Sequence, residues 1–485
     1  MAGFARQAVI LSVSRIANYG VMIVSPIILV RVLTVGDFGR YREFVLYASV
    51  LVSIASFSIS DSLLYFVPAR PDSTWRIVRQ TATLTAIVST SIVLGFYILD
   101  LVTGGALVGR YRLPLALYVL LFVNVDFWEA FWLATHQTIR VFIYTAARLI
   151  VRLLVVVGVA AATNNVVTII WSLIVLEAVR CAAFAGVWIV LDRARHEPPI
   201  PNILRDQLRF CVPIGLATVL FLISRNLGNV VVAKWLGAAA LAQMTIGTYG
   251  EPVILALRNS ISAAMLPELV RRGVQSSEAP TQLWRRATVI NCVLLFPAAV
   301  LMAWFARPLV LNVFGAKYLP AVAVLQVYAL VMVVACFDFS TLLRAINQTK
   351  PLVASNLTSA IASGVALFFL LPVAGLVGVA VALVVSSFVE AAYNAWCVRR
   401  FYGVTLRKLV PWARAAQVAL CAAVVAVPVI VVTSRVRVGM TGVMLASVLY
   451  LILFAVLLMA TGVEEAITLA RRVRNSLAIV AFSGR

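Results

Sequence analysis

Apolar residues run for about twenty positions at a time along the chain, and short polar stretches separate the runs. An α-helix needs about 20 apolar residues to cross the hydrocarbon core of a bilayer, whereas transmembrane β-strands are shorter and alternate polar with apolar positions. The runs therefore predict about fourteen membrane-spanning helices. We place them at residues 8–33, 43–67, 80–100, 113–135, 143–162, 166–191, 210–236, 244–267, 287–306, 320–343, 353–371, 375–397, 412–432 and 440–461.

Arginine and lysine gather in alternate connections between the predicted spans. The connections around Arg76, Arg205 and Arg285 are rich in basic residues, whereas residues 163–165 and 372–374 carry none. An excess of these residues marks the cytoplasmic side of a membrane. We therefore expect a multi-pass protein of a cytoplasmic (inner) membrane with both termini in the cytoplasm.

Composition agrees with this prediction. The 485 residues are 63% hydrophobic and only 12% charged, whereas soluble domains carry about 25% charged residues. The formal net charge of +22 follows from the basic cytoplasmic connections and indicates contact with anionic membrane lipids, so we expect no nucleic-acid partner.

The longest connection divides the chain into two lobes. It contains Pro198, Pro199 and Pro201, and it separates two short similar stretches, 30–33 at the end of the first span and 233–236 at the end of the seventh. Six spans in each copy would make the halves parallel repeats related by an axis along the membrane normal. We therefore predict an all-α polytopic membrane protein with two six-helix lobes in a parallel pseudo-twofold repeat plus two accessory helices. Its parts are 1–197, the N-terminal lobe; 198–209, a cytoplasmic linker; 210–400, the C-terminal lobe; and 401–485, the accessory spans with an amphipathic cytoplasmic tail.

Charged residues interrupt several of these apolar runs. A charge at bilayer depth costs from about 2.5 kcal/mol to well above 10, so it persists where water, a partner or a polar ligand meets it. Arg225 and Asn226 share a predicted span that contains no acid, and the guanidinium group of arginine binds phosphate or carboxylate at two points. This pattern favours an anionic passenger.

Some of the deep charges have a structural alternative. Glu177 and Arg180 are three residues apart and Glu251 and Arg258 are seven apart, so each pair shares a helix face and could neutralise itself. Arg148 and Arg152 could extend to the cytoplasmic interface instead. The acids remain candidates for ion coupling or gating: Asp61, Asp126, Glu129, Glu177 with Arg180, and Glu251.

Catalytic chemistry is sparse. The two histidines, His136 and His196, have no metal-binding spacing, the six cysteines form no Cys-x-x-Cys pair, and no glycine-rich phosphate loop ending in Gly-Lys-Ser/Thr occurs. We expect no enzyme activity, no metal and no cofactor. The aromatic residues Phe127, Trp128, Phe131 and Trp132 could stack on sugars, but packing in a core or an interface belt is the favoured interpretation.

Short motifs of the chain resemble a known family. Arg15 lies in the first span, Arg31-Val32-Leu33-Thr34 closes it, and Asp37-Phe38-Gly39-Arg40-Tyr41 precedes the second span. Pro213 opens the seventh span and Trp235-Leu236-Gly237 closes it. These features are similar to those of bacterial polysaccharide-exporter flippases of the multidrug/oligosaccharidyl-lipid/polysaccharide (MOP) superfamily.

The resemblance implies two six-helix lobes around a central cavity that alternates its access. The implied activity is the transfer of an undecaprenyl-pyrophosphate-linked oligosaccharide from the inner to the outer leaflet, and the implied partners are that anionic lipid, H+ or Na+, and a polysaccharide polymerase machinery. The candidate substrate-binding residues are Arg15, Asn18, Arg31, Arg225, Asn226 and Arg258. Family members commonly carry an acid in the seventh span, where this chain has Arg225.

Three other functions compete with this expectation. A drug/cation antiporter of the same superfamily would use Asp61, Asp126 and Glu129 to exchange protons. A peptidoglycan lipid-precursor flippase would carry a chemically similar passenger. A membrane glycosyltransferase would need large extracytoplasmic loops with catalytic carboxylates, and the short connections of this chain disfavour it.

Overall fold

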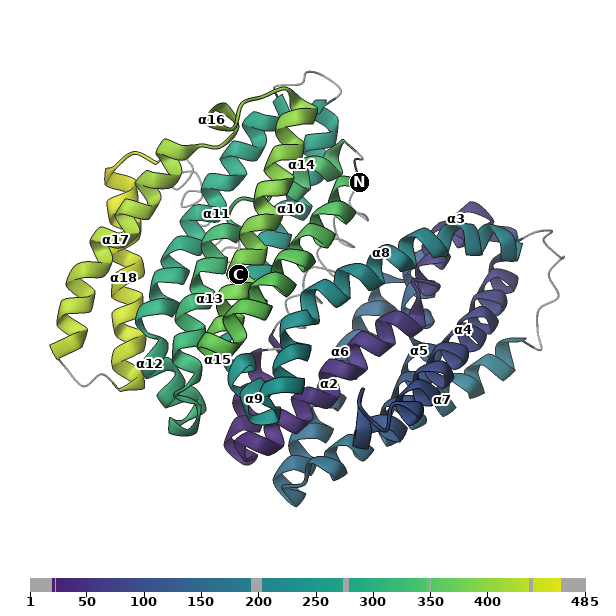
Figure 1. Cartoon of the computed structure of the whole chain (residues 1–485). Helices are drawn as coiled ribbons and strands as arrows, with labels where there is room; N and C mark the ends of the chain where they lie inside the picture. The colour runs from purple at the N-terminus through teal and green to yellow at the C-terminus, as the bar shows by residue number, and fades with distance from the viewer. Residues whose placement is uncertain are drawn as a thin grey trace, which may run out of the picture. The chain divides into compact units, whose positions relative to one another are not determined.

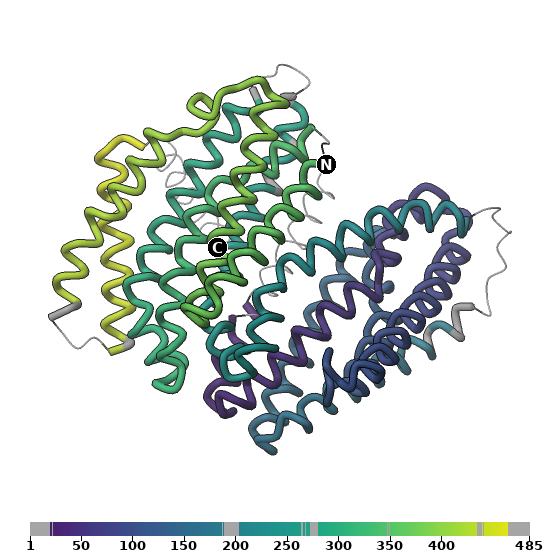
Figure 2. Tube along the Cα trace, viewed as in Figure 1, coloured from purple at the N-terminus to yellow at the C-terminus, as the bar shows by residue number. Residues whose placement is uncertain are grey.

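The computed structural model describes residues 20–21, 23–192, 203–273, 279–346, 348, 350–435 and 439–463. Every regular element in these ranges is a helix, and the contacts divide the chain into two compact units, Met1–Ala242 and Gln243–Arg485. Figure 1 and Figure 2 trace the chain through each unit. The predicted all-α polytopic fold is therefore confirmed.

The first unit is built around one central helix, α5 (Arg112–Ala134), which contacts α2, α3, α4, α6 and α7. Its buried face includes Phe127 and Trp128, which pack with Trp75 in an aromatic core. Phe127 and Trp128 thus lie in the core, which agrees with the packing interpretation favoured from the sequence. The other helices of the unit are α2 (Val35–Ser56), α3 (Leu63–Ala69), α4 (Thr74–Val102), α6 (Thr138–Thr163), α7 (Val166–Asp192), α8 (Ile203–Val231) with its π-helical end η4 (Val232–Leu236), and the start of α9 (Ala238–Gly247).

The second unit is organised around α11 (Ala279–Trp304), which contacts α10, α13 and α17. Residues from these helices and from α18 form one apolar core that includes Cys292, Met332, Val418 and Tyr450. The unit comprises α10 (Glu251–Gly273), α12 (Ala306–Leu309), α13 (Ala321–Ala335), α14 (Phe339–Ala345), α15 (Lys350–Tyr402), α16 (Leu406–Leu409), α17 (Trp412–Arg435) and α18 (Met440–Ala460). The last two, coloured yellow-green and yellow, pack against each other (Figure 1).

Each predicted span coincides at least in part with helical residues, apart from its undescribed positions. Within the described ranges, ten helices are long and apolar enough to cross a bilayer, or eleven when α2 and α3 count as one bent span. In that count α15 is one helix, although Gly375, at φ 52° and ψ −126°, divides it into two. The total of fourteen remains a prediction.

The lobe boundaries also remain a prediction. Helix α8 contacts α2 and thereby belongs to the first compact unit, whereas the sequence interpretation starts the second lobe at residue 210. Residues 193–202, which include His196 and the first part of the predicted linker, lie outside the described residues, as does the predicted tail helix after residue 463.

A buried carboxylate fixes the connection between α4 and α5. The Asp100 side chain is fully buried and accepts hydrogen bonds from the backbone amides of Leu107 and Val108 at 3.0 and 2.9 Å. Its other oxygen lies 2.6 Å from Nε of Arg112. A carboxylate that accepts several N–H donors holds a loop in one conformation because each bond to a charged group is strong.

We expect Asp100→Asn to lower the free energy of unfolding by about 2 kcal/mol, since hydrogen bonds to a charged group contribute about 1.5–3 kcal/mol each and the amide retains only part of them. Thermal unfolding of the purified protein in detergent would measure this loss. Asp72→Asn, at an exposed acid, is the matched control and should change little. Equal stability of the two variants would contradict the anchoring role of Asp100.

Candidate functional site

A cluster of charged side chains lies inside the first unit, contributed by three neighbouring helices. Arg148 of α6 places Nη1 2.9 Å from Oδ1 of Asp126 and Nη2 3.4 Å from Oε2 of Glu129, both on α5. Arg180 of α7 lies 2.8 Å from Glu177 on its own helix and donates a hydrogen bond to the backbone oxygen of Phe122. The structure thus brings together four of the predicted coupling or gating residues.

Arg152 and Asp61 extend this cluster. Arg152 donates a hydrogen bond to Tyr41 and is attracted electrostatically to Glu177. The Asp61 carboxylate accepts a hydrogen bond from Ser58 and lies close enough to Asp126 for the two negative charges to repel each other. Both Arg148 and Arg152 therefore have partners inside the unit, and the alternative in which they extend to the cytoplasmic interface stays a prediction. The helical spacing did not reveal these partners because they come from other helices.

Among the described residues, this cluster contains more acids than arginines. The four acids Asp61, Asp126, Glu129 and Glu177 face the three arginines 148, 152 and 180. A carboxylate at bilayer depth that no basic group neutralises can bind a proton or a cation, because a lone charge there is costly. The role of these carboxylates in ion coupling stays a prediction.

A break in the second span places Asp61 beside this cluster. Phe57 and Ser58 have left-handed backbones with φ of 43° and 54°, and the axes of the two helical segments differ by 50°. Helix α8 supports the break: Thr218 and Ser58 share a hydrogen bond of 3.3 Å, and Gln207 donates to Ser62 and Thr81. Backbone outside the helical region costs about 1–3 kcal/mol and persists only where its surroundings require it.

The sequence interpretation missed this break. The only signal was a run of serines around Asp61, at positions 53, 56, 58, 60 and 62, because serine competes for backbone hydrogen bonds and weakens a helix. Broken spans are typical of the substrate and ion sites of transporters.

In the second unit, the helix is interrupted between α13 and α14, and Asp338 directly precedes α14. The Asp338 carboxylate accepts hydrogen bonds from Ser262, Ser340 and Thr341 at 2.6, 2.6 and 2.7 Å. Arg258 of α10 is the arginine whose charge acts on this carboxylate. The sequence pattern associated Arg258 with Glu251, whereas the structure associates it with Asp338 on another helix.

The remaining candidates occupy separate positions. Arg225 of α8 is exposed and its guanidinium carbon lies 5.8 Å from the ring centre of Phe221. Asn226 donates to the backbone oxygen of Leu222, and Arg31 is exposed at the end of the helix Ile23–Val32. Glu251 begins α10 in the second unit. Arg15 and Asn18 lie outside the described residues.

Metal-binding groups do not gather in the described part of the chain: no three His, Cys, Asp or Glu side chains there lie close enough to hold an ion together.

Comparison with known proteins identifies the family. Residues 28–323 match the family described as polysaccharide biosynthesis protein, and no curated protein matches the sequence. Among solved structures, the lipid II flippase MurJ in an inward closed conformation is similar, with a TM-score of 0.70, 12% identity, and coverage of 93% of this chain and 98% of MurJ.

Two further structures share the fold. An inward-facing multidrug resistance MATE transporter has a TM-score of 0.54 and 16% identity over 81% of this chain and 94% of its own. A MOP-superfamily transporter from Pyrococcus furiosus has a TM-score of 0.52 and 15% identity over 82% and 95%. The family match spans more than half of this chain, and the protein therefore belongs to the polysaccharide biosynthesis protein family, with the membrane fold of the MOP-superfamily flippases and transporters.

Proposed function

We propose that the protein is a flippase that moves an undecaprenyl-pyrophosphate-linked oligosaccharide from the inner to the outer leaflet of the cytoplasmic membrane by alternating access. The observation that carries this proposal is the match of residues 28–323 to the polysaccharide biosynthesis family. The fold it shares with a lipid II flippase supports the same conclusion.

The chemistry of such a passenger determines what the protein has to provide. A sugar-pyrophosphate head is too polar for hydrocarbon, while its lipid tail never needs to leave it, so the protein has to supply a polar path for the head alone. The outward movement of negative charge across an inside-negative membrane is favoured by about 2.3 kcal/mol per charge per 100 mV. The arginines and amides at positions 15, 18, 31, 225, 226 and 258 are our candidates for contacts with the head.

The charged cluster of the first unit is our candidate for coupling. Protonation or cation binding at one of the carboxylates of Asp61, Asp126, Glu129 and Glu177 would change the charge around Arg180 and the broken second span. Glu251, at the start of α10, is our coupling candidate in the second unit. This coupling would link an ion gradient to the motion of the lobes.

We expect Arg225→Gln and Arg258→Gln each to slow flipping at least tenfold, because glutamine retains hydrogen bonding but loses the charge that attracts pyrophosphate. The measurement is transfer of a fluorescently labelled undecaprenyl-pyrophosphate oligosaccharide in liposomes. Arg271→Gln is the matched control, since Arg271 is an exposed arginine paired with Glu268. Wild-type flipping by both variants, with normal folding, would exclude these arginines from the binding site.

A drug/cation antiporter is the second candidate. The side chains of Asp126 and Glu129 are 41% and 32% exposed, and the chain shares its fold with a MATE transporter. An antiporter predicts that a pH gradient drives uptake of a cationic dye such as ethidium into the same liposomes, without lipid flipping.

A peptidoglycan-precursor flippase is the third candidate function, and the similarity of the fold to MurJ favours it. Transfer of labelled lipid II in preference to the oligosaccharide lipid would identify it.

A further inference from the structure

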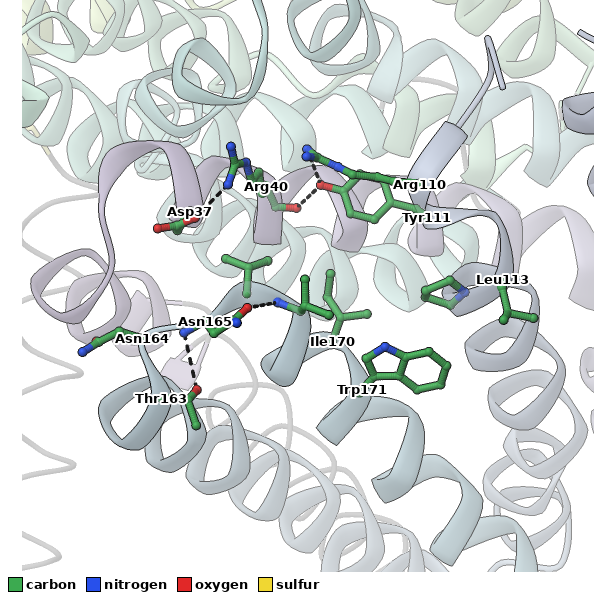
Figure 3. A pocket seen from close by; sticks show the side chains of 13 residues that line it. Asp37, Arg40, Arg110, Tyr111, Leu113, Thr163, Asn164, Asn165, Ile170 and Trp171 are labelled. Atoms are coloured by element: carbon green, nitrogen blue, oxygen red, sulfur yellow. Dashed lines mark hydrogen bonds and ion pairs between the residues drawn. The ribbon is translucent and has the colours of Figure 1, made fainter. Parts of the chain in front are cut away.

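A pocket of about 590 Å³ opens at one end of the first unit, away from the charged cluster. It lies where the start of α2, the connection before α5 and the turn between α6 and α7 meet (Figure 3). Its volume lies within the range of about 300–1,000 Å³ that is typical of small-molecule sites. Neither the sequence pattern nor the family match assigns a ligand to it.

Polar and aromatic groups face each other across this pocket. In Figure 3, Arg40 and Arg110 lie on one side and the indole of Trp171 lies on the other. Trp171, in the second turn of α7, is 39% exposed. The backbone and side chains of 163–165 add hydroxyl and amide groups to the rim.

The charges of the pocket are already neutralised. Arg40 lies 3.2 Å from Asp37, and Arg110 lies 3.5 Å from Glu43 while donating to the Tyr111 hydroxyl. A free anion would compete with these acids for the guanidinium groups, whereas a neutral polyhydroxyl ligand can use both the N–H donors and the carboxylate acceptors. The pocket is therefore better suited to a neutral polar ligand than to a phosphate.

The rim is held in place before any ligand arrives. Asp100 fixes the connection that carries Arg110, and Thr34 caps α2 through the amide and carboxylate of Asp37. Asn165 caps α7 by accepting a hydrogen bond from the amide of Val167 at 2.9 Å. A preformed rim reduces the ordering cost of binding, which matters for weak ligands such as sugars.

We propose that this pocket binds one or two sugar residues of a glycan, with the face of one ring on Trp171 and its hydroxyls on Arg40, Asp37 and the amides of the α6–α7 turn. An aromatic side chain offers a flat apolar face to the C–H side of a sugar ring, and polar groups around it fix the hydroxyls. The source of the glycan rests on the proposed function: we take the glycan to be the sugar head of the passenger, bound on the side of the membrane to which the passenger is delivered. The α6–α7 turn has no basic residues, and the alternation of basic connections in the sequence predicts that this end of the unit faces outward.

The experiment uses the full-length protein in lipid nanodiscs and free sugars, so it requires no flipping. The probes are N-acetylglucosamine, glucose, galactose, mannose and rhamnose with their common disaccharides, followed by saturation-transfer NMR and tryptophan fluorescence. We expect at least one probe to bind saturably in the millimolar range. Trp171→Ala should weaken that binding at least tenfold, and Trp171→Phe by only a few-fold because a ring remains.

Trp235→Ala is the matched control, since Trp235 is a 68% exposed tryptophan of the same unit outside the pocket, and it should bind as the wild type does. Binding that is absent for every probe, or that survives Trp171→Ala unchanged in folded protein, would overturn the proposal. Glycerol phosphate that binds in place of the sugars would overturn it too and identify a lipid-headgroup site. Sugar binding without lipid flipping would support the pocket while contradicting the proposed function.

Discussion

Replacing Arg148 with methionine should lower the free energy of unfolding by about 3 kcal/mol. The change leaves Asp126 and Glu129 without the guanidinium that lies 2.9 and 3.4 Å from them. Breaking a buried ion pair by removing one partner costs about 3–5 kcal/mol, and the lower end applies because Asp126 is partly exposed. Unfolding of the protein in mixed micelles by increasing amounts of a denaturing detergent would measure the loss.

Two further variants test the cause. Arg140→Met removes an exposed arginine of the same helix that bonds only to Gln137 among the hydrogen bonds of the described residues, and it should change stability little. Adding Asp126→Asn and Glu129→Gln to Arg148→Met should restore most of the loss, since no uncompensated charge then remains. A triple variant as unstable as the single one would show that the arginine acts through packing and not through charge.

Gly39→Leu should destabilise the first unit by at least about 3 kcal/mol. A Cβ at Gly39 would collide with the backbone carbonyl of Ala238, at the start of α9, and a backbone group cannot rotate away. Small residues permit such close approach between helices in membranes, and overpacking costs about 1–3 kcal/mol for each inserted group, with more where the backbone must move. Thermal unfolding in detergent provides the measurement.

Gly158→Ala is the contrasting substitution within α6. A Cβ there meets no atom within 4 Å, so the helix should gain up to about 1 kcal/mol from the lower conformational freedom of alanine. If Gly39→Leu melts at the wild-type temperature, the contact between α2 and α9 does not stabilise the fold.

The helices could be predicted from the sequence, but the breaks within them could not. Hydrophobic runs of span length can only be satisfied as helices in lipid, so the pattern predicts them directly. The break at Phe57 and Ser58 depends on α8, which follows about 150 residues later and supplies Thr218 and Gln207. A glycine at 215 lets the carbonyl of Phe57 approach, with only 2.6 Å from that oxygen to the position of a Cβ. Such a partner is invisible to local patterns.

The contacts of the candidate site could likewise be predicted only where they lie within one helix. The pairing of Glu177 with Arg180 follows from helical spacing, and the structure contains it. The bonds of Arg148 to Asp126 and Glu129 join two helices, and the association of Arg258 with Asp338 also joins distant segments. Sequence spacing therefore identified the charged residues but not which of them neutralise one another. Their roles in binding and coupling remain predictions.

The cysteines of the chain make it a convenient subject for chemical mapping of sidedness. Five of the six thiols are buried, and Cys181 is only partly accessible. A membrane-impermeant maleimide should therefore react slowly with the native protein, so a new cysteine would dominate the signal without removal of the others. Asn164 is an exposed position in a short turn and is suited to this purpose. Modification of Asn164→Cys in intact spheroplasts would assign the α6–α7 turn to the outer surface, and modification only after lysis would assign it to the cytosol.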